Sequence, residues 1–450
     1  MTNRTLIKGG IVYSVDPEIG DFAKGDVLIE DDKIVAVGAD ISADDVRLVD
    51  ATNMIVMPGL VDTHRHLWQS ALRQIAADWT IGQYVEMMLG VIGPRFSAED
   101  VLIADLLGSL EALDGGVTTI LDWSHIVNSP EHADAAVQGL TESGIRAIYA
   151  YGAPRSPMSS WYEDDVARVQ TAYFSSGNSR LTMALASLGA EFSSLDEGVN
   201  DIELARRLGL RTSVHLGVGL LGEKRAVTNM NARGLLGPDI IYVHCTTCLD
   251  AELRLISESG GHVSISPRVE MQMGHGYPAT GRLLSAGIQP SLSVDVVSAV
   301  GGSLFAEMRG TLEAERGLQN RIALERGEWV GELELLARDV VRMATIEGAR
   351  TLGMEDKIGS LTPGKQADVI MLKVDMPNLS LVNDLSAAIT LADTGNVETI
   401  FVAGRLVKMN GTLLSHDMRA VQDRAWRSRD RLLPGLTIHG AKELSAAIPS

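Results

Sequence analysis

The chain has 450 residues, with 39 Lys or Arg against 58 Asp or Glu, so its formal net charge is −19 at pH 7. This acidic balance, without a basic cluster to offset it, opposes binding to a nucleic-acid backbone or an anionic membrane, and we expect neither as a partner. A hydrophobic content of 45% excludes a disordered chain and is enough to build a large buried core.

The two cysteines, Cys245 and Cys248, form a single C-x-x-C motif, which is not the disulfide framework of a small secreted protein. No apolar stretch approaches the 18 or more residues of a membrane span, and residues 1–10 lack the pattern of a signal peptide. We therefore expect a cytoplasmic protein with two buried thiols. Cys245 follows His244 directly and could approach a site there.

Four segments near the two ends of the chain are rich in β-branched residues: 5–14, 26–38, 367–373 and 399–408. The first is predicted to turn at Gly9 and Gly10, and the second to form a hairpin around residues 30–32. We expect these segments to pair into one small β-sandwich domain, built from residues 1–57 together with 358–450.

Between these ends, short apolar runs alternate with helical stretches, which is the pattern of βα units. The eight runs end near Asp62, Asp122, Tyr149, Leu188, His215, His244, Ile265 and Val294. Helical spacing is found at residues 97–113, 200–208 and 250–259. Eight units predict an α/β fold of the (β/α)8 TIM barrel type over residues 58–357. A doubly wound sheet is less consistent with the sequence, because no G-x-G-x-x-G turn follows the first run.

Side chains that bind metals occur where four of the runs end. His64 and His66 alternate in an extended segment and can face one ion, while His215, His244 and Asp295 each close a run of β-forming residues. Because catalytic groups of a barrel gather at the carboxyl ends of its strands, closure of the barrel would bring these side chains together. Three imidazoles and a carboxylate suit Zn²⁺, with Fe²⁺, Co²⁺ or Mn²⁺ as alternatives.

The remaining histidines and several aromatic residues leave alternatives open. His125 could line a pocket, whereas His262 and His275 are equally compatible with a structural role. We expect three further histidines at the surface: His132, His416 and His439. Five aromatic residues near strand ends could stack on a flat substrate or pack in the core: Trp68, Trp79, Tyr84, Trp123 and Phe192.

Several motifs together resemble the amidohydrolase superfamily over essentially the whole chain. They are MPGLVDTHRH at 57–66, LTPGKQADVIML at 361–372 and FVAGRLV at 401–407, with His215, His244 and Asp295 at strand ends. The flanking motifs resemble the split β-sandwich of that family. Residues 67–84 resemble the substrate-covering loop and helix of its triazine hydrolase, guanine deaminase and cytosine deaminase branch.

The resemblance implies a ligand set for one divalent ion, with Zn²⁺ first among the candidates: His64, His66, His215 and Asp295. It also implies that His244 hydrogen-bonds the reacting water or the substrate, and that Asp295 accepts the proton of the water. Binuclear members carry a carboxylated lysine after the fourth strand. Residues 181–194 contain no lysine, which favours a mononuclear site.

One position departs from this branch, which usually continues the fifth-strand histidine as H-x-x-E, the glutamate carrying a proton to the leaving nitrogen. Here the fourth residue is Val218, which cannot carry a proton. Proton transfer then falls to Asp295 with His244, or to Glu191 or Glu270, which follow the fourth and seventh runs. The alternative for both glutamates is an ordinary loop carboxylate.

The expected function is metal-dependent hydrolysis of a C–N bond, by deamination or a related displacement, on a small nitrogen-containing compound, with a cyclic one as the first candidate. The alternatives are an exocyclic or acyclic amide, urea or carbamate, or a ring C–halogen bond. A catalytically silent scaffold is less consistent with a complete ligand set. The large size and acidic surface are compatible with a homo-oligomer, a dimer or larger.

Overall fold

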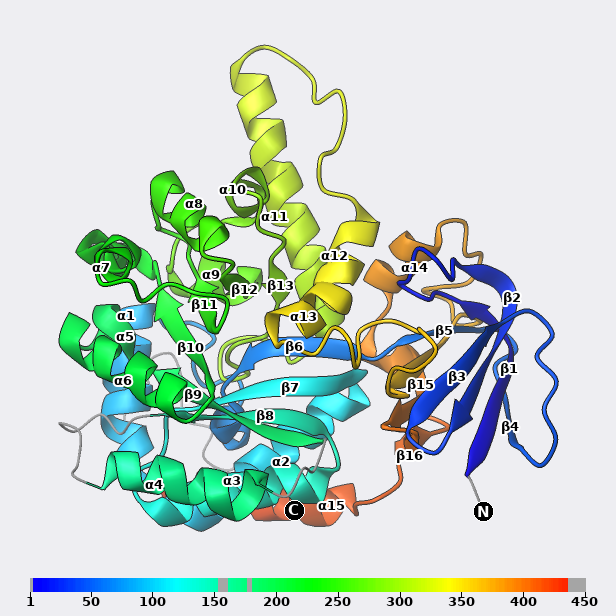
Figure 1. Cartoon of the computed structure of the whole chain (residues 1–450), viewed down its shortest axis with the longest axis horizontal. Coiled ribbons are helices and arrows are strands. Elements are labelled where there is room, and N and C mark those ends of the chain that lie inside the picture. The colour runs from blue at the N-terminus through cyan, green and yellow to red at the C-terminus, as the bar shows by residue number, and fades with distance from the viewer. Residues whose placement is uncertain (1–2, 153–160, 176–179, 436–450) are drawn as a thin grey trace.

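Two sheets organise the chain in the computed structural model, which describes residues 3–152, 161–175 and 180–435. One sheet is the eight-stranded parallel barrel, and the other is a nine-stranded mixed sheet built from both ends of the chain. Figure 1 shows the mixed sheet beside the barrel, on the side where β5 leads into β6.

The barrel strands follow one another around the ring in chain order: β6 (Leu60–Arg65), β7 (Val117–Ser124), β8 (Arg146–Gly152), β9 (Leu181–Ser187), β10 (Arg211–Leu216), β11 (Ile240–His244), β12 (His262–Ile265) and β13 (Ser291–Leu292). The ring closes between the last and first strands through the backbone. The amide of Asp295 donates to the carbonyl oxygen of His64 at 3.0 Å, and the amide of His66 donates to that of Asp295 at 2.9 Å. The predicted TIM barrel is confirmed.

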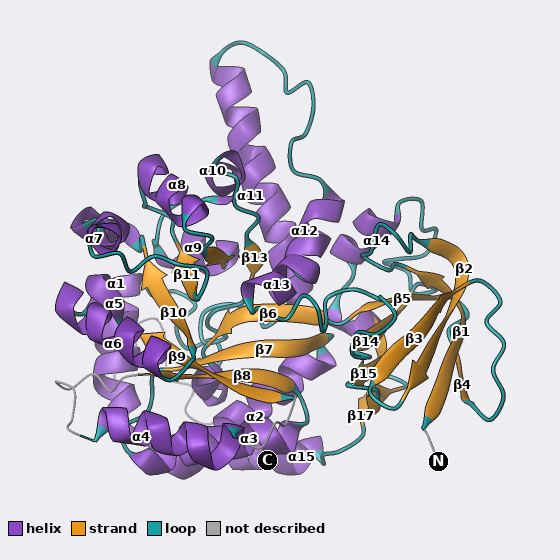
Figure 2. Ribbon diagram, in the orientation of Figure 1, coloured by secondary structure: helices purple, strands orange, loops and turns teal. Residues whose placement is uncertain are grey.

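Helices surround this sheet (Figure 2). The longer ones are α2 (Ala98–Asp114), α3 (Pro130–Ser143), α4 (Tyr162–Val169), α6 (Leu195–Arg207), α8 (Asp250–Glu258) and α11 (Leu304–Glu325). The shorter ones are α1 (Ile81–Tyr84), α5 (Gly189–Phe192), α7 (Ala226–Ala232), α9 (Pro267–Met273), α10 (Thr280–Ser285), α12 (Ala337–Met343) and α13 (Ile346–Thr351). The predicted helices at 97–113 and 250–259 agree closely with α2 and α8. Helix α6 begins earlier than predicted, because Ser194 and Glu197 form a capping box at its start.

The mixed sheet has the order β17-β16-β15-β14-β5-β1-β2-β3, with β4 paired to β1. Its strands are β1 (Arg4–Val12), β2 (Phe22–Glu30), β3 (Lys33–Gly38), β4 (Arg47–Asp50), β5 (Met54–Pro58), β14 (Val369–Lys373), β15 (Val397–Val402), β16 (Arg405–Met409) and β17 (Thr412–Leu413). The hairpin around residues 30–32 is present. The predicted turn at Gly9 and Gly10 is wrong: β1 continues through it, and the register shift between Ile7 and Gly10 is a bulge, with Gly9 at φ 79°.

The strand that carries His64 and His66 is anchored directly to the mixed sheet. β5 passes into β6 through Gly59, where a Cβ atom would come within 2.1 Å of the Thr118 hydroxyl oxygen. At the same end of the barrel, Arg146 of β8 forms a buried ion pair with Asp368, just before β14. The mixed sheet therefore fixes the base of the barrel on which the site is built.

The C-terminal segment returns to the barrel. Helix α14 (Leu385–Leu391) packs on α11 and α12, and α15 (Met418–Leu432) packs on α2. The Ser428 hydroxyl donates to Asp100 at 2.7 Å. The domain boundary between residues 357 and 358, where we expect the barrel to end, stays a prediction. Within the described ranges, no helix combines the length and apolar character that crossing a membrane requires.

Candidate metal centre

Four side chains from three places in the chain meet at the carboxyl ends of the barrel strands. His64 and His66 come from the end of β6, His215 from β10, and Asp295 from the residues after β13. One ligand atom from each lies within 4.8 Å of those of the others. Asp295 Oδ1 is 3.4 Å from His64 Nε2 and 3.3 Å from His66 Nε2. The structure thus brings together all four residues expected to hold the ion.

The electrostatics of this cluster fit a divalent cation. Burial lowers the pKa of His64 to about 3 and also holds the pKa of His215 well below its ordinary value, so both imidazoles are neutral at pH 7. Burial alone would raise the pKa of Asp295, but hydrogen bonds from His64 and His66 outweigh it and hold that pKa well below its ordinary value. Neutral imidazoles and an ionised carboxylate are the protonation states that metal binding requires.

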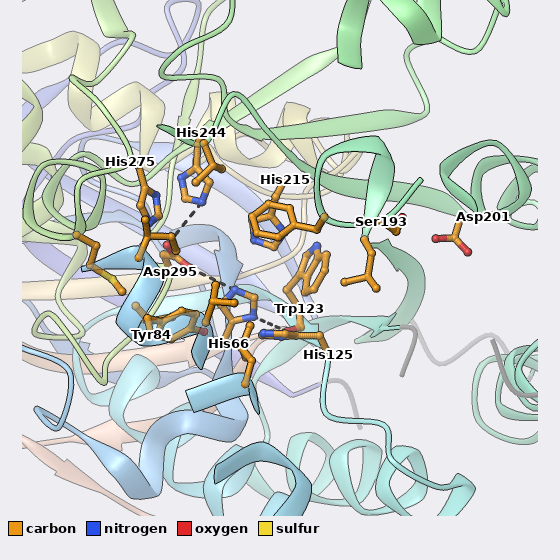
Figure 3. Close-up of a pocket in the computed structure, with 18 of the residues that line it drawn as sticks. His66, Tyr84, Trp123, His125, Ser193, Asp201, His215, His244, His275 and Asp295 are labelled. Atoms are coloured by element: carbon orange, nitrogen blue, oxygen red, sulfur yellow. Dashed lines mark hydrogen bonds and ion pairs between the residues drawn. The ribbon is translucent and has the colours of Figure 1, made fainter. Parts of the chain in front are cut away.

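The outer contacts of the ligands orient them further. His66 Nδ1 lies 2.7 Å from the Trp123 carbonyl oxygen, which leaves Nε2 facing Asp295 (Figure 3). Asp295 itself has φ 67°, an uncommon conformation for a residue with a side chain. The two backbone hydrogen bonds that close the barrel hold Asp295 in this conformation. The same contacts therefore close the ring of strands and orient the carboxylate.

His244, at the end of β11, lies between two carboxylates. Its Nδ1 is 3.1 Å from Glu270 Oε1, and its Nε2 is 3.7 Å from Asp295 Oδ2. Burial would lower the pKa of His244, but the hydrogen bond to Glu270 and the charge of Asp295 outweigh it and raise that pKa. The ring nitrogen Nε2 faces the space beside Asp295.

Neither glutamate considered as a proton carrier lines the cavity above the cluster. Glu270 lies behind His244 and also accepts the Ser266 amide at 2.8 Å. Glu191 accepts the amides of Gly217 at 2.8 Å and Val218 at 3.3 Å, which shapes the loop after β10. Their role in proton transfer stays a prediction. The contacts described here show that Glu270 positions His244 and that Glu191 positions the loop after β10. The side chain of Val218 lines the cavity where the branch usually has its glutamate.

The cavity has a volume of about 420 Å³ and opens over the cluster. Its walls are mostly apolar or aromatic: Ile81, Tyr84, Val85, Leu89, Trp123, Leu188, Phe192, Val218, Met273 and Val296. Tyr84, Trp123 and Phe192 thus lie where they can contact a flat substrate, whereas Trp68 and Trp79 are buried away from the cavity. Three polar residues also line the cavity: Ser193, Glu197 and Asp201. Ser193 and Asp201 lie farther from the cluster (Figure 3).

Two histidines whose role the sequence left open, His125 and His275, line the cavity. His275 lies beside His244 and Asp295, and the three side chains offer ligand atoms within 4.8 Å of one another. Only the motif G-H-G at 274–276, after the seventh strand, marks it in the sequence. His262, the first residue of β12, lies at the opposite end of the barrel.

The expectation that His132 lies at the surface is wrong. Its ring is buried, with Nδ1 3.0 Å from the Ser129 hydroxyl and Nε2 2.9 Å from the Phe96 carbonyl oxygen. His416 is half-buried against the Glu142 carbonyl oxygen, and His439 lies outside the described residues. Cys245 and Cys248 are both buried, as predicted, and neither lines the cavity.

The sequence profile of the amidohydrolase family matches residues 55–407. The chain belongs to this family. Membership identifies it as a metal-dependent hydrolase that acts on carbon–nitrogen bonds other than peptide bonds, and the histidine-rich cluster is its metal site.

The amidohydrolase has relatives of similar length. It is 27% identical over 442 residues to a 5'-deoxyadenosine deaminase of Methanosarcina mazei, covering 95% of this chain and 98% of that one. It is 29% identical over 423 residues to a 5-methylthioadenosine/S-adenosylhomocysteine deaminase of Symbiobacterium thermophilum, covering 90% and 93%.

Solved structures share the fold. An adenosine deaminase from Xanthomonas campestris with bound zinc superposes with a TM-score of 0.83 at 22% identity, covering 95% of this chain and 98% of that chain. Atrazine chlorohydrolase from Arthrobacter aurescens TC1, complexed with zinc, superposes with a TM-score of 0.82 at 22% identity, covering 94% and 100%.

Proposed function

We propose that this amidohydrolase is a hydrolytic deaminase that removes the exocyclic amino group of an adenine-containing nucleoside, with one Zn²⁺ held by His64, His66, His215 and Asp295. The observation that carries the proposal is the buried cluster of four ligands beneath an aromatic cavity. Two relatives that match nearly the full length of this chain support this substrate class: one is a deaminase of 5'-deoxyadenosine, and the other is a deaminase of 5-methylthioadenosine.

The distribution of polar groups in the cavity supports a nucleoside. A flat base can stack among Trp123, His125 and Phe192, next to the ligands. Ser193 and Asp201 lie on the far side of Trp123 and His125 from Asp295 (Figure 3), where they can form hydrogen bonds with ribose hydroxyls. The two ends of the cavity thus match the two ends of such a substrate.

The reaction replaces the amino group with a carbonyl oxygen, consuming water and releasing ammonia. His64, His66, His215 and Asp295 would hold the divalent ion, whose chemistry when bound would be to lower the pKa of a water from 15.7 towards about 7. Asp295 Oδ2, the carboxylate oxygen nearer His244 than His64 or His66, would accept a proton from the attacking water and then pass it to the leaving nitrogen, which departs as ammonia. His244 donates a hydrogen bond from Nε2 to the oxygen that becomes negative, and Glu270 holds the ring in position.

A second candidate function is hydrolysis of an amide, urea or carbamate C–N bond. The observation that favours it is Val218, an apolar side chain at the position where the deaminase branch has a proton-carrying glutamate. An amine leaving group with an alkyl or aryl substituent would fit the apolar wall formed by Val85, Leu89 and Leu188. The expected homo-oligomer and cytoplasmic location stay predictions.

The deciding experiment combines metal analysis of the purified protein with a substrate screen that detects ammonia and organic amines separately. The deaminase proposal requires about one ion per chain and ammonia release from 5'-deoxyadenosine or 5'-methylthioadenosine. Release of an organic amine from ureas or amides, with no ammonia from either nucleoside, would replace it with the second candidate. A protein that retains no metal and hydrolyses nothing would contradict both.

A further inference from the structure

His275 carries two buried nitrogen atoms that make no hydrogen bond within the described part of the chain. The residue is 3% exposed, and its ring lines the cavity. Most buried polar atoms in proteins are paired, and leaving one unpaired costs about 1–3 kcal/mol. Because the residue lines the cavity, a molecule bound there can supply the partner that the ring lacks.

The backbone around His275 holds the ring at this place. Its amide donates to the Glu270 carbonyl oxygen at 3.0 Å, and its own carbonyl oxygen accepts the Gly219 amide at 2.6 Å and the Thr246 hydroxyl at 2.8 Å. Gly276 has φ 136°, and a Cβ atom there would come 3.0 Å from Thr246 Oγ1. Three hydrogen bonds and one obligatory glycine thus fix a loop that directs an imidazole into the cavity.

The ring faces the groups that would carry out the reaction. Its centroid is 4.8 Å from that of His244, with the planes at 83°. Figure 3 shows His275 beside His244 and above Asp295. A neutral imidazole offers one donor and one acceptor, so the ring can pair with either kind of polar atom on a bound molecule.

We propose that His275 is a substrate-binding residue that hydrogen-bonds a heteroatom next to the carbon under attack, on the side of the cavity where Val218 offers no polar group. For an aminopurine this heteroatom is a ring nitrogen, and that assignment rests on the proposed function. For a urea or amide it is the carbonyl oxygen or the amide nitrogen. In either case the bond orients the carbon over Asp295 and His244.

A different use of the same residues would be a second cation held by His244, His275 and Asp295. The contacts of His244 argue against it. Its Nδ1 is 3.1 Å from Glu270 Oε1 and its Nε2 is 3.7 Å from Asp295 Oδ2, so the ring already joins two carboxylates, and a cation at Nε2 would displace the second of these contacts. Metal content is therefore part of the test.

The test compares His275→Ala and His275→Gln with the wild type, using 5'-methylthioadenosine as the probe. We expect His275→Ala to lower kcat/KM by roughly 10- to 100-fold, chiefly through KM, with metal content unchanged at about one ion per chain. His275→Gln, which keeps one donor and one acceptor, should recover part of the loss. His262→Ala, at the opposite end of the barrel, is the matched control and should keep the wild-type constants.

Two results would overturn the proposal: kinetic constants of His275→Ala within twofold of the wild type, or a second ion in the wild type that this variant loses. Circular dichroism and Tm establish that each variant folds, and if the alanine variant does not, the glutamine variant and a His275→Asn variant decide. If the wild type releases no ammonia from the nucleoside, the proposed function fails, while the inference on His275 is decided with the urea or amide that the wild type hydrolyses.

Discussion

Glu270 and His244 form a buried pair in which a carboxylate oxygen lies 3.1 Å from the imidazole Nδ1. The same oxygen also accepts the Ser266 amide, so the carboxylate is fixed at the start of α9 and in turn fixes the ring. This pairing determines that Nε2 of His244 faces Asp295 and the cavity.

Replacing Glu270 with Gln should therefore damage catalysis more than substrate binding. A neutral amide is a weaker acceptor for His244 Nδ1 than a carboxylate and orients the ring less firmly, so we expect kcat to fall about 10- to 100-fold while KM changes little. Steady-state kinetics at several pH values would measure this effect.

The comparison variant is Glu191→Gln, which disturbs the acceptors of the Gly217 and Val218 amides. We expect a lower Tm and a smaller loss of kcat than in Glu270→Gln. A loss of several orders of magnitude in Glu191→Gln alone would instead identify Glu191 as the proton carrier.

The ligand set makes a separate prediction. The double variant His64→Ala and His66→Ala removes two of the four donors, and elemental analysis should find little metal in the purified protein. Asp295→Asn should abolish turnover even where metal remains, because the amide accepts no proton. Wild-type metal content in the double variant would show that the ion lies elsewhere.

The ligands could be predicted from the sequence because each follows an apolar run, and parallel strands in a barrel end at one face. His275 could not be assigned in this way, since it lies after a helix in a loop whose path depends on contacts with Gly219 and Thr246. His132 is a polar residue in a helix, which predicts a position at the surface. The ring is buried because it contacts the carbonyl oxygen of Phe96, which belongs to a different segment of the chain. The spacing of residues within the helix does not reveal this contact.

The same limit applies to the join between the two sheets. The Arg146 side chain donates to Asp368 from Nε and Nη2, at 2.9 Å in both cases, and neither residue is exposed to solvent. Replacing Arg146 with Met leaves a buried carboxylate without its partner, and we expect a loss of about 3–5 kcal/mol in the free energy of unfolding.

Urea denaturation would measure the effect of Arg146→Met. Its control is Arg206→Ala, which removes the half-exposed pair with Asp239 and should cost about 1 kcal/mol or less. Equal losses in the two variants would mean that the junction does not depend on the buried pair.

Asp105 of α2 gives a prediction on pH. Both of its carboxylate oxygens are buried without a hydrogen-bond partner in the described part of the chain. Burial, with the neighbouring Asp122, raises the pKa of Asp105 well above its ordinary value, and burial raises the pKa of Asp122 to about 7. The folded protein therefore holds more protons than the unfolded chain above pH 3.8, the ordinary value for Asp.

The sign of the effect follows from this difference. The stability contribution of the pair is complete below about pH 3.8 and is lost as the pH rises towards 7, since ionisation is opposed only in the folded state. Asp105→Asn removes a carboxyl group that takes up a proton on folding above pH 3.8, so the variant should gain more stability over the wild type at pH 8 than at pH 5. Thermal unfolding of both proteins at pH 5 and pH 8 measures the difference. If the difference in Tm between Asp105→Asn and the wild type is no larger at pH 8 than at pH 5, Asp105 is ionised and paired in the folded protein.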